Sequence, residues 1–473
     1  MKHIIARLSA SLRSSLCWDK AFSRLVLMIA LPMIFQDLMA ACLHIVDGMM
    51  VSGLGDAAYS AVIQANRFSF LFYLLNFGAS SGFAIFFSQY WGAKDIRSIR
   101  QTMGLALRLA SGFALCFSLA GFFFPHRIMP FFLPPGESFT LAVSYLRIVA
   151  PTYLLSAWSA IYSASIKAAE KTYIPMIAVS CSLVVDTLIS YVLIYGLFGF
   201  PALGVQGAAI GTVVSSAMTL AINLAFAYGK KLPAAVSFKE LFSREKIFSQ
   251  RIMKTVLPVI CNEGLWGLGM VVYAIFYGTM GDVTVAAVGV SSTVSDLLWV
   301  FLMAMTHAAA IIIGKALGKG DKTLAFSHSK RLLAGSVVVG LLLGVFTLLV
   351  HPFFTGLFSG LSAPAREKAT TLLLISALVL WLRAFNCLNV VGILRAGGDT
   401  VFSLKLDILP MWCIGIPIVG IMALWLKCPI ELVYPCTLLD ELVKCIIGIP
   451  HFRNKQWMHV LTEKKEDSLH GNA

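Results

Sequence analysis

The stretch that decides the fold spans residues 31–64 and reads LPMIFQDLMAACLHIVDGMMVSGLGDAAYSAVIQ. Its first part is long and apolar enough for a helix that crosses a bilayer, which needs about 20 mostly apolar residues. The same pattern returns at residues 257–290 as LPVICNEGLWGLGMVVYAIFYGTMGDVTVAAVGV. The second stretch begins 226 residues after the first (257 minus 31), and at this offset both Leu31-Pro32 and Gly55-Asp56 recur. Apolar composition alone does not readily produce a shared register of Pro, Gly and Asp, so the sequence predicts a duplicated unit.

Similar apolar stretches continue along the whole chain of 473 residues, and we count twelve of them. Their predicted bounds are 24–50, 60–91, 101–124, 140–166, 173–196, 204–228, 252–280, 285–316, 331–357, 369–394, 401–424 and 430–450. Lys and Arg concentrate in alternate connections between them, which is typical of cytoplasmic loops. We therefore expect an all-α integral membrane protein of the cell (inner, cytoplasmic) membrane, with twelve transmembrane helices and both termini in the cytoplasm.

The longest polar connection divides the predicted helices six and six. We expect an N-lobe at 24–228, a cytoplasmic inter-lobe loop at 229–251, a C-lobe at 252–450 and a cytoplasmic tail at 451–473. The first segment, 1–23, carries Leu8, Leu12 and Leu16 beside basic residues, which favours an amphipathic helix on the inner leaflet. Because each half has an even number of spans, a pseudo-two-fold axis along the membrane normal is expected to relate the lobes.

Composition excludes several classes of protein. The chain is 58% hydrophobic and 13% charged, far from the roughly 45–50% apolar and 25% charged residues of soluble domains. Its net charge of +14 is spread over loops, which argues against nucleic acid. The GxxxxGK[ST] and HExxH patterns are absent from the sequence, and we expect no enzyme, no cofactor and no ATP hydrolysis in this chain. Transport would then be driven by an ion gradient.

Acidic residues inside the predicted spans are the first candidates for function, because a carboxylate in a bilayer costs at least about 2.5–3.5 kcal/mol. Glu263 follows Asn262, and at the offset of 226 this pair coincides with Asp37 and Gln36. Each half thus places an amide and a carboxylate shortly after a Pro. Such oxygens can bind a cation or exchange a proton.

Two further groups of polar residues lie in the spans. Asp47 and Asp186 are candidates for a second acidic locus, with Ser190 one helical turn beyond Asp186. A polar stripe on the tenth span is a secondary candidate, either to compensate a buried carboxylate or to line a cavity. One acid of the eleventh span is another secondary candidate, and it can pair with a neighbouring cation. These secondary residues are Arg383, Asn386, Asn389 and Asp407.

Several motifs resemble those of the multidrug and toxic compound extrusion (MATE) transporters. They read HIVDGMMVSGLGDAA at 44–58, GAAIGTVVS at 207–215, PVICNEGLWGLG at 258–269, GILRAGGDT at 392–400 and LDILPMWCIGIP at 406–417. They occur in both halves and span about 400 residues. The resemblance implies two six-helix lobes and alternating access. It also implies export of organic cations, drugs or other amphipathic small molecules in exchange for Na⁺ or H⁺, and we expect a monomer.

The resemblance also implies roles for individual residues. The acid of the family's first helix corresponds to Asp47 and that of the seventh helix to Glu263. The family's fifth helix often carries an Asn and then an Asp, which correspond here to Asp186 and Ser190. The first position has therefore gained an acid, and the second has lost one. Some members of the family carry an acid in helix ten, and this chain has no acid at the corresponding place near Arg383. The coupling ion stays open between Na⁺ and H⁺, and a flippase for lipids or lipid-linked sugars and a membrane receptor without transport remain alternatives.

Overall fold

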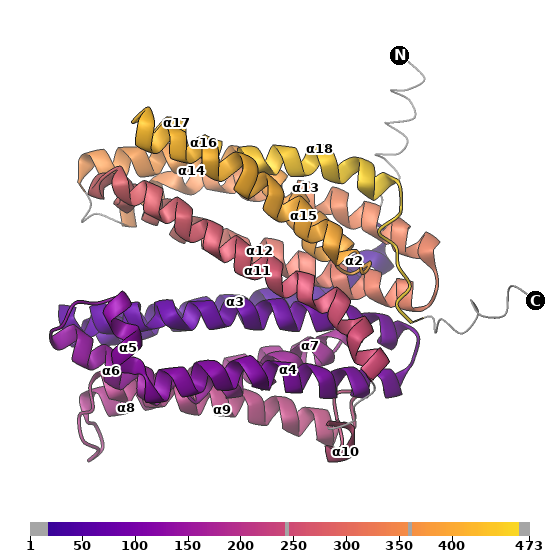
Figure 1. The fold of residues 1–473 in the computed structure, drawn as a ribbon, viewed down its shortest axis with the longest axis horizontal. Coiled ribbons are helices and arrows are strands. Elements are labelled where there is room, and N and C mark those ends of the chain that lie inside the picture. Colours follow the sequence, from indigo (N-terminus) through magenta and orange to yellow (C-terminus); the bar gives the residue numbers. More distant parts are fainter. Residues whose placement is uncertain (1–17, 242–245, 358–361, 463–473) are drawn as a thin grey trace, which may run out of the picture. The chain divides into compact units, whose positions relative to one another are not determined.

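The apolar stretches fold as helices in the computed structural model, which describes residues 18–241, 246–357 and 362–462. No strand occurs among these residues, which confirms the all-α fold class. Figure 1 gives the order of the elements along the chain. In the first half they are α2 (Lys20–Ser52), α3 (Asp56–Gly92), α4 (Ile96–Phe123), α5 (Pro125–Ile128), η1 (Met129–Phe131), α6 (Glu137–Val149), α7 (Thr152–Ala168), α8 (Tyr173–Tyr195), α9 (Val205–Gly229) and α10 (Phe238–Leu241).

The second half follows the same order and adds several short segments near its end. Its elements are α11 (Lys246–Thr279), α12 (Asp282–Gly318), α13 (Lys322–Leu357), α14 (Ala363–Cys387), η2 (Leu388–Leu394), α15 (Thr400–Pro410), η3 (Met411–Gly415), α16 (Ile416–Gly420), η4 (Ile421–Trp425), α17 (Ile430–Cys436) and α18 (Leu439–Arg453).

Most of the helices are long and apolar enough to cross a membrane. Ten of those in the described residues pass this test singly, and α6 with α7 forms an eleventh span bent by 46°. The last predicted span, 430–450, is helical but divided into α17 and α18. It carries four charged residues, Glu431, Asp440, Glu441 and Lys444, and its two helices are only 7 and 15 residues long, which explains why neither passes as a span by itself.

The predicted duplication is visible in the helix bounds. Helices α2 and α11 begin at Lys20 and Lys246, and helices α3 and α12 cover Asp56–Gly92 and Asp282–Gly318, all at the same offset of 226 (246 minus 20, 282 minus 56). The final glycines of α3 and α12 have equivalent roles. A Cβ on Gly92 would collide with the Lys315 backbone of α12, and one on Gly318 with the Gln89 backbone of α3. Small residues at these two places let the ends of the helices touch.

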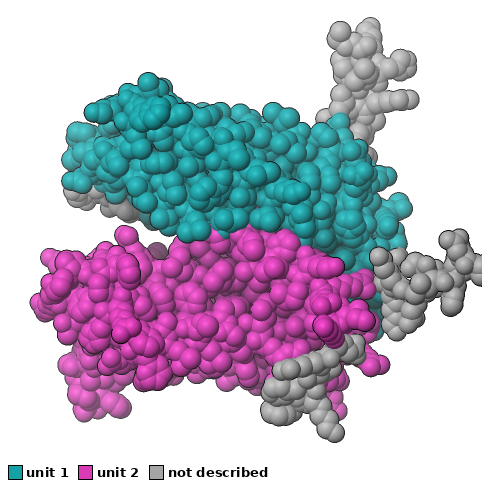
Figure 2. All heavy atoms as spheres, viewed as in Figure 1, with its two compact units in different colours: residues 1–30, 88–94, 265–473 teal, residues 31–87, 95–264 magenta. Residues whose placement is uncertain are grey.

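The chain divides into two compact units, coloured separately in Figure 2. Unit 1 holds residues 1–30, 88–94 and 265–473, and unit 2 holds residues 31–87 and 95–264. The division therefore falls inside α2, α3 and α11 as well as in a connection. The predicted amphipathic segment lies mostly in 1–17, outside the described residues.

Two predicted loops contain more helix than expected. Within the predicted inter-lobe loop, α10 forms at Phe238–Leu241 and α11 already begins at Lys246, and α18 extends to Arg453 in the predicted tail. The prediction followed the apolar stretches, which end where the lipid ends. A helix satisfies its own backbone and can continue into water.

The end of the tenth span and the eleventh span depart from regular α-helix. The segments η2, η3 and η4 are π-helical, and Pro410 and Pro417 interrupt the backbone ladder between them. π-Helical turns often occur at functional sites. Here η2 holds Asn389, and α15 just before η3 holds Asp407.

Candidate functional site

The first group of candidate residues lies in unit 2, between α8 and α9. Asp186 and Ser190 are each 1% exposed, and the Ser190 hydroxyl donates a hydrogen bond of 3.2 Å to Asp186 Oδ1. Gly211 of α9 faces both side chains, since a Cβ there would collide with Ser190 Oγ and lie 2.7 Å from Asp186 Oδ1. The glycine therefore lets α9 pack directly onto the polar pair. Sequence analysis did not select it, although it lies in the quoted motif at 207–215.

Asp47 of α2 belongs to the same group. Its carboxylate and that of Asp186 repel each other electrostatically. The buried Oδ1 of Asp47 has no hydrogen-bond partner among the described residues. Within that part of the chain, the charged groups acting on Asp47 and Asp186 include no Lys or Arg. The structure thus brings together the predicted second acidic locus, whose two carboxylates have no cationic partner in the described part of the chain.

Asp37, in contrast, has a cation opposite it. Lys167 of α7 interacts electrostatically with Asp37 of α2, and both residues lie in unit 2. Gln36 Nε2 donates a long hydrogen bond of 3.4 Å to Asp37 Oδ1. This secondary candidate is therefore engaged by groups of the protein itself. The partner Lys167 lies 130 positions away in sequence, so spacing gave no sign of it.

Glu263 and Asn262 lie on α11, in its part that belongs to unit 2. They are 8% and 2% exposed. Helix α3 passes very close to them at Gly78. A Cβ on Gly78 would lie 2.9 Å from the Ile260 Cα atom and 3.2 Å from Glu263 Cγ. The position of the Glu263 carboxylate therefore depends on the small size of Gly78.

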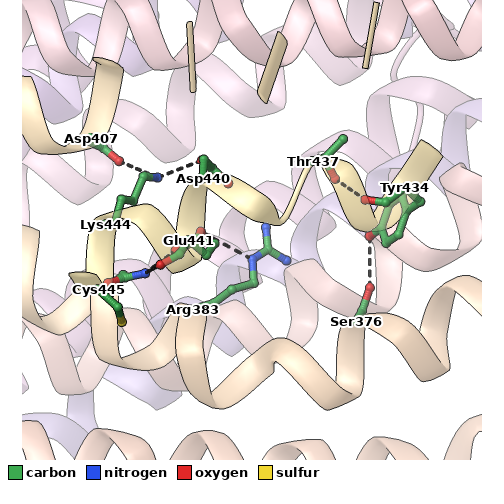
Figure 3. A network of polar contacts seen from close by, with 10 residues as sticks. Ser376, Arg383, Asp407, Tyr434, Thr437, Asp440, Glu441, Lys444 and Cys445 are labelled. Atoms are coloured by element: carbon green, nitrogen blue, oxygen red, sulfur yellow. Dashed lines mark hydrogen bonds and ion pairs between the residues drawn. The ribbon is translucent and has the colours of Figure 1, made fainter. Parts of the chain in front are cut away.

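The secondary candidates of the second half lie in unit 1 and contact α18 (Figure 3). Lys444 Nζ lies 2.9 Å from Asp407 Oδ1 of α15 and 3.1 Å from Asp440 Oδ2 of its own helix. The side chains of Lys444 and Asp440 are 6% and 9% exposed. Asp407 is thus paired with a cation, although this cation lies on α18 rather than next to it in sequence. Lys444 was missed as a site residue, and its spacing of four from Asp440 was the available signal.

The polar stripe of α14 contacts the neighbouring acid of α18. Arg383 Nε lies 4.0 Å from Glu441 Oε1, and Asn386 Nδ2 donates hydrogen bonds of 2.7 Å to both the Glu441 carboxylate and its carbonyl oxygen. The thiol of Cys445 donates to Asn386 Oδ1 at 3.3 Å. Asn389 of η2 is fully buried, and its amide nitrogen lies near Gly448 of α18. Arg383 and Asn386 therefore compensate the half-buried carboxylate of Glu441.

Within the described residues, no group of three or more His, Cys, Asp or Glu side chains is arranged to hold a metal ion. The acids instead fall into separate groups with different partners. No cationic side chain in residues 18–241, 246–357 and 362–462 acts on Asp47 or Asp186, whereas Lys444 bridges Asp407 and Asp440.

Comparison with known families agrees with the repeat. The MatE family model matches residues 32–192 and again residues 258–420, which together make up more than half of the chain. The chain belongs to the MatE family of transporters. The two matches begin 226 residues apart (258 minus 32), at the offset predicted from sequence, and the predicted resemblance to MATE transporters is confirmed.

Relatives of this MatE protein match it over most of their length. An uncharacterized transporter YisQ from Bacillus subtilis is 22% identical over 444 residues, which cover 93% of this chain and 96% of YisQ. A probable multidrug resistance protein NorM from Agrobacterium fabrum is 25% identical over 421 residues, covering 86% and 88%. A solved MOP superfamily transporter from Pyrococcus furiosus has a TM-score of 0.83 at 18% identity, covering 91% and 95%, and shares the fold.

Proposed function

We propose that this MatE protein is a cation-coupled antiporter, which exports organic cations, drugs or other amphipathic small molecules in exchange for Na⁺ or H⁺. The observation that carries the proposal is the pair Asp47 and Asp186, two mutually repelling carboxylates on which no Lys or Arg of the described residues acts. The probable multidrug resistance proteins among its relatives support the substrate class.

A bound cation relieves the repulsion within this pair. Charges interact more strongly in a protein interior than in water, so a single Na⁺ or H⁺ between the two carboxylates stabilises whichever arrangement of the protein encloses it. A substrate that competes for the same charge favours the other arrangement. Each tenfold difference in cation affinity between the two arrangements shifts their equilibrium by about 1.4 kcal/mol.

Glu263 has a second role in the proposal. It is a buried carboxylate on a different helix from Asp47 and Asp186, and it is held against α3 at Gly78. We assign it to coupling, as an acid that binds the cation or the cationic group of the substrate. Asn262, which precedes it and is also buried, supplies an amide to the same segment of α11. The protein acts as a monomer in the cell membrane, with both termini in the cytoplasm and without a cofactor.

The test is efflux of a cationic dye from reconstituted vesicles in which Na⁺ and pH gradients are imposed separately. The variants are Asp47→Asn, Asp186→Asn and Glu263→Gln. Asp56→Asn is the matched control, because Asp56 is an exposed acid at the start of α3. Size-exclusion profiles confirm that each variant is folded.

The expected result is flux driven by one of the two gradients, lost in the three variants and kept in Asp56→Asn. Full flux in Asp47→Asn and Asp186→Asn would remove that pair from the mechanism. Absence of dye flux in folded wild type under either gradient would contradict export of organic cations. A lipid-translocation assay on the same vesicles then tests the flippase alternative.

A further inference from the structure

Each unit contains a pair of acids drawn from two helices, with one member buried and the other half-buried, and the two pairs differ in their cation. In unit 2, Asp47 of α2 and Asp186 of α8 have no cationic side chain acting on them in the described chain. In unit 1, Asp407 of α15 and Asp440 of α18 have the ammonium of Lys444 between them. Figure 3 shows the lysine reaching both carboxylates.

The contacts of Lys444 are those of a bound cation. Its Nζ lies 2.9 and 3.1 Å from oxygens of the two acids, both within hydrogen-bond distance. The lysine residue is 4% exposed, so its charge is removed from water and depends on these oxygens. Because Lys444 and Asp440 are one turn apart on α18 while Asp407 comes from α15, the ammonium connects two helices.

Other charged and titratable groups lie around Lys444, Asp407 and Asp440, and they interact with these residues or with the neighbouring Glu441. Arg383 of α14 faces Glu441 and also interacts electrostatically with Asp296 of α12. Tyr273 of α11 interacts electrostatically with Asp440, Glu441 and Lys444, and its buried hydroxyl has no hydrogen-bond partner in the described part of the chain. Cys387 of α14 interacts with Glu441, Asp407 and Arg395, and Cys445 with Glu441.

We propose that Lys444 is a tethered cation, which permanently occupies a monovalent-cation site formed by Asp407 and Asp440 and so excludes external Na⁺ and H⁺ from this acid pair. The occupied site itself does not depend on the proposed function. Only its consequence does, namely that cation exchange is confined to the acids of unit 2. Removal of the ammonium should expose a site in which the carboxylate oxygens of Asp407 and Asp440 accept a free cation.

The test is equilibrium binding of radioactive Na⁺ to the purified full-length protein in detergent, with choline chloride maintaining ionic strength. Lys444→Met keeps the length of the side chain without its charge. Lys405→Met is the matched control, since Lys405 is an exposed lysine on α15, two residues before Asp407. We expect Lys444→Met to bind one more Na⁺ per molecule than wild type, Lys405→Met to bind the same number, and Asp407→Asn with Lys444→Met to lose the gain.

The gain is measured relative to wild type, so it is independent of whether unit 2 binds Na⁺, H⁺ or neither. If protons fill the exposed site instead, Lys444→Met gains no Na⁺ but its melting temperature falls with rising pH more steeply than that of wild type, which also supports the tethered cation. A folded Lys444→Met protein with neither change overturns it. If Lys444→Met does not fold, the triple variant with Asp407→Asn and Asp440→Asn decides. Folding of that neutral variant supports the charge role, and its failure refutes it.

Discussion

The close approach of α3 to α11 beside Glu263 gives a quantitative prediction. Helix α3 contacts α11 at Gly78, where an added Cβ would lie 2.9 Å from the Ile260 Cα atom and 3.2 Å from Glu263 Cγ. The first of these atoms is backbone, so Gly78→Ala requires the two helices to move apart locally. Gly264→Ala is a matched control one residue after Glu263, because a Cβ there meets no atom within 4 Å.

Both substitutions replace Gly by Ala inside a helix, which stabilises by about 0.5–1 kcal/mol because the unfolded chain loses freedom. This gain is common to the two variants. Forcing an extra methyl group into a packed interface costs about 1–3 kcal/mol. The free energy of unfolding of Gly78→Ala should therefore lie about 1–3 kcal/mol below that of Gly264→Ala.

The measurement is reversible unfolding by SDS in mixed micelles, followed by gradient-driven dye efflux of both variants in vesicles. We expect Gly78→Ala to unfold at lower SDS and to lose flux, because displacement of α11 moves the Glu263 carboxylate, whereas Gly264→Ala keeps wild-type flux. Equal unfolding curves for the two variants would falsify the close contact between α3 and α11. Reduced stability with unchanged flux would instead separate Glu263 from coupling.

Two further substitutions test the contacts of the other acids. Asp37→Asn leaves Lys167 without its opposite charge, so we expect a loss of roughly 1–3 kcal/mol of unfolding free energy, between the values for exposed and buried pairs, that the added Lys167→Met change largely restores. An equally unstable double variant would contradict the pairing. Ser190→Ala removes the hydroxyl that donates to Asp186 and should cost about 1.5–3 kcal/mol. Ser180→Ala on the same helix should cost less, because the Ser180 hydroxyl has no hydrogen-bond partner among the described residues. Matching thermal unfolding of the two serine variants would show that the Ser190 bond adds nothing.

Much of the fold followed from sequence because two strong signals agree. Lipid requires about 20 apolar residues per helix, and this length located the spans to within several residues. The register of Pro, Gly and Asp then revealed the duplication, since these residues are held in place by backbone geometry rather than by apolarity. The start of α11 at Lys246 was missed because a helix can extend beyond the lipid, where its residues need not be apolar and hydropathy does not detect it.

The candidate acids were also found from sequence, because a charge in a span is conspicuous, but their partners were not. Asp37 meets Lys167 across 130 positions, and Asp407 meets Lys444 across 37. Such pairs form through packing of distant helices, which leaves no local pattern. The exception is Lys444 with Asp440, whose spacing of four on one helix could have indicated the pair.

The different cations of the two acid pairs have a consequence for the energy of transport. If only Asp47 and Asp186 exchange a cation, one monovalent ion enters for each monovalent substrate that leaves, and no net charge moves. A second exchanged cation at Asp407 and Asp440 would move one net charge per cycle. A membrane potential of 100 mV then contributes about 2.3 kcal/mol to each cycle, which changes the substrate gradient that transport can sustain roughly 40-fold. We therefore expect dye efflux by wild type to be insensitive to a membrane potential clamped with valinomycin and K⁺, and efflux by Lys444→Met to become sensitive. Sensitivity of the wild type at fixed Na⁺ and pH gradients would mean that a second charge moves, through Glu263 or through unit 1. If Lys444→Met then showed no greater sensitivity than wild type, Lys444 would not confine exchange to unit 2.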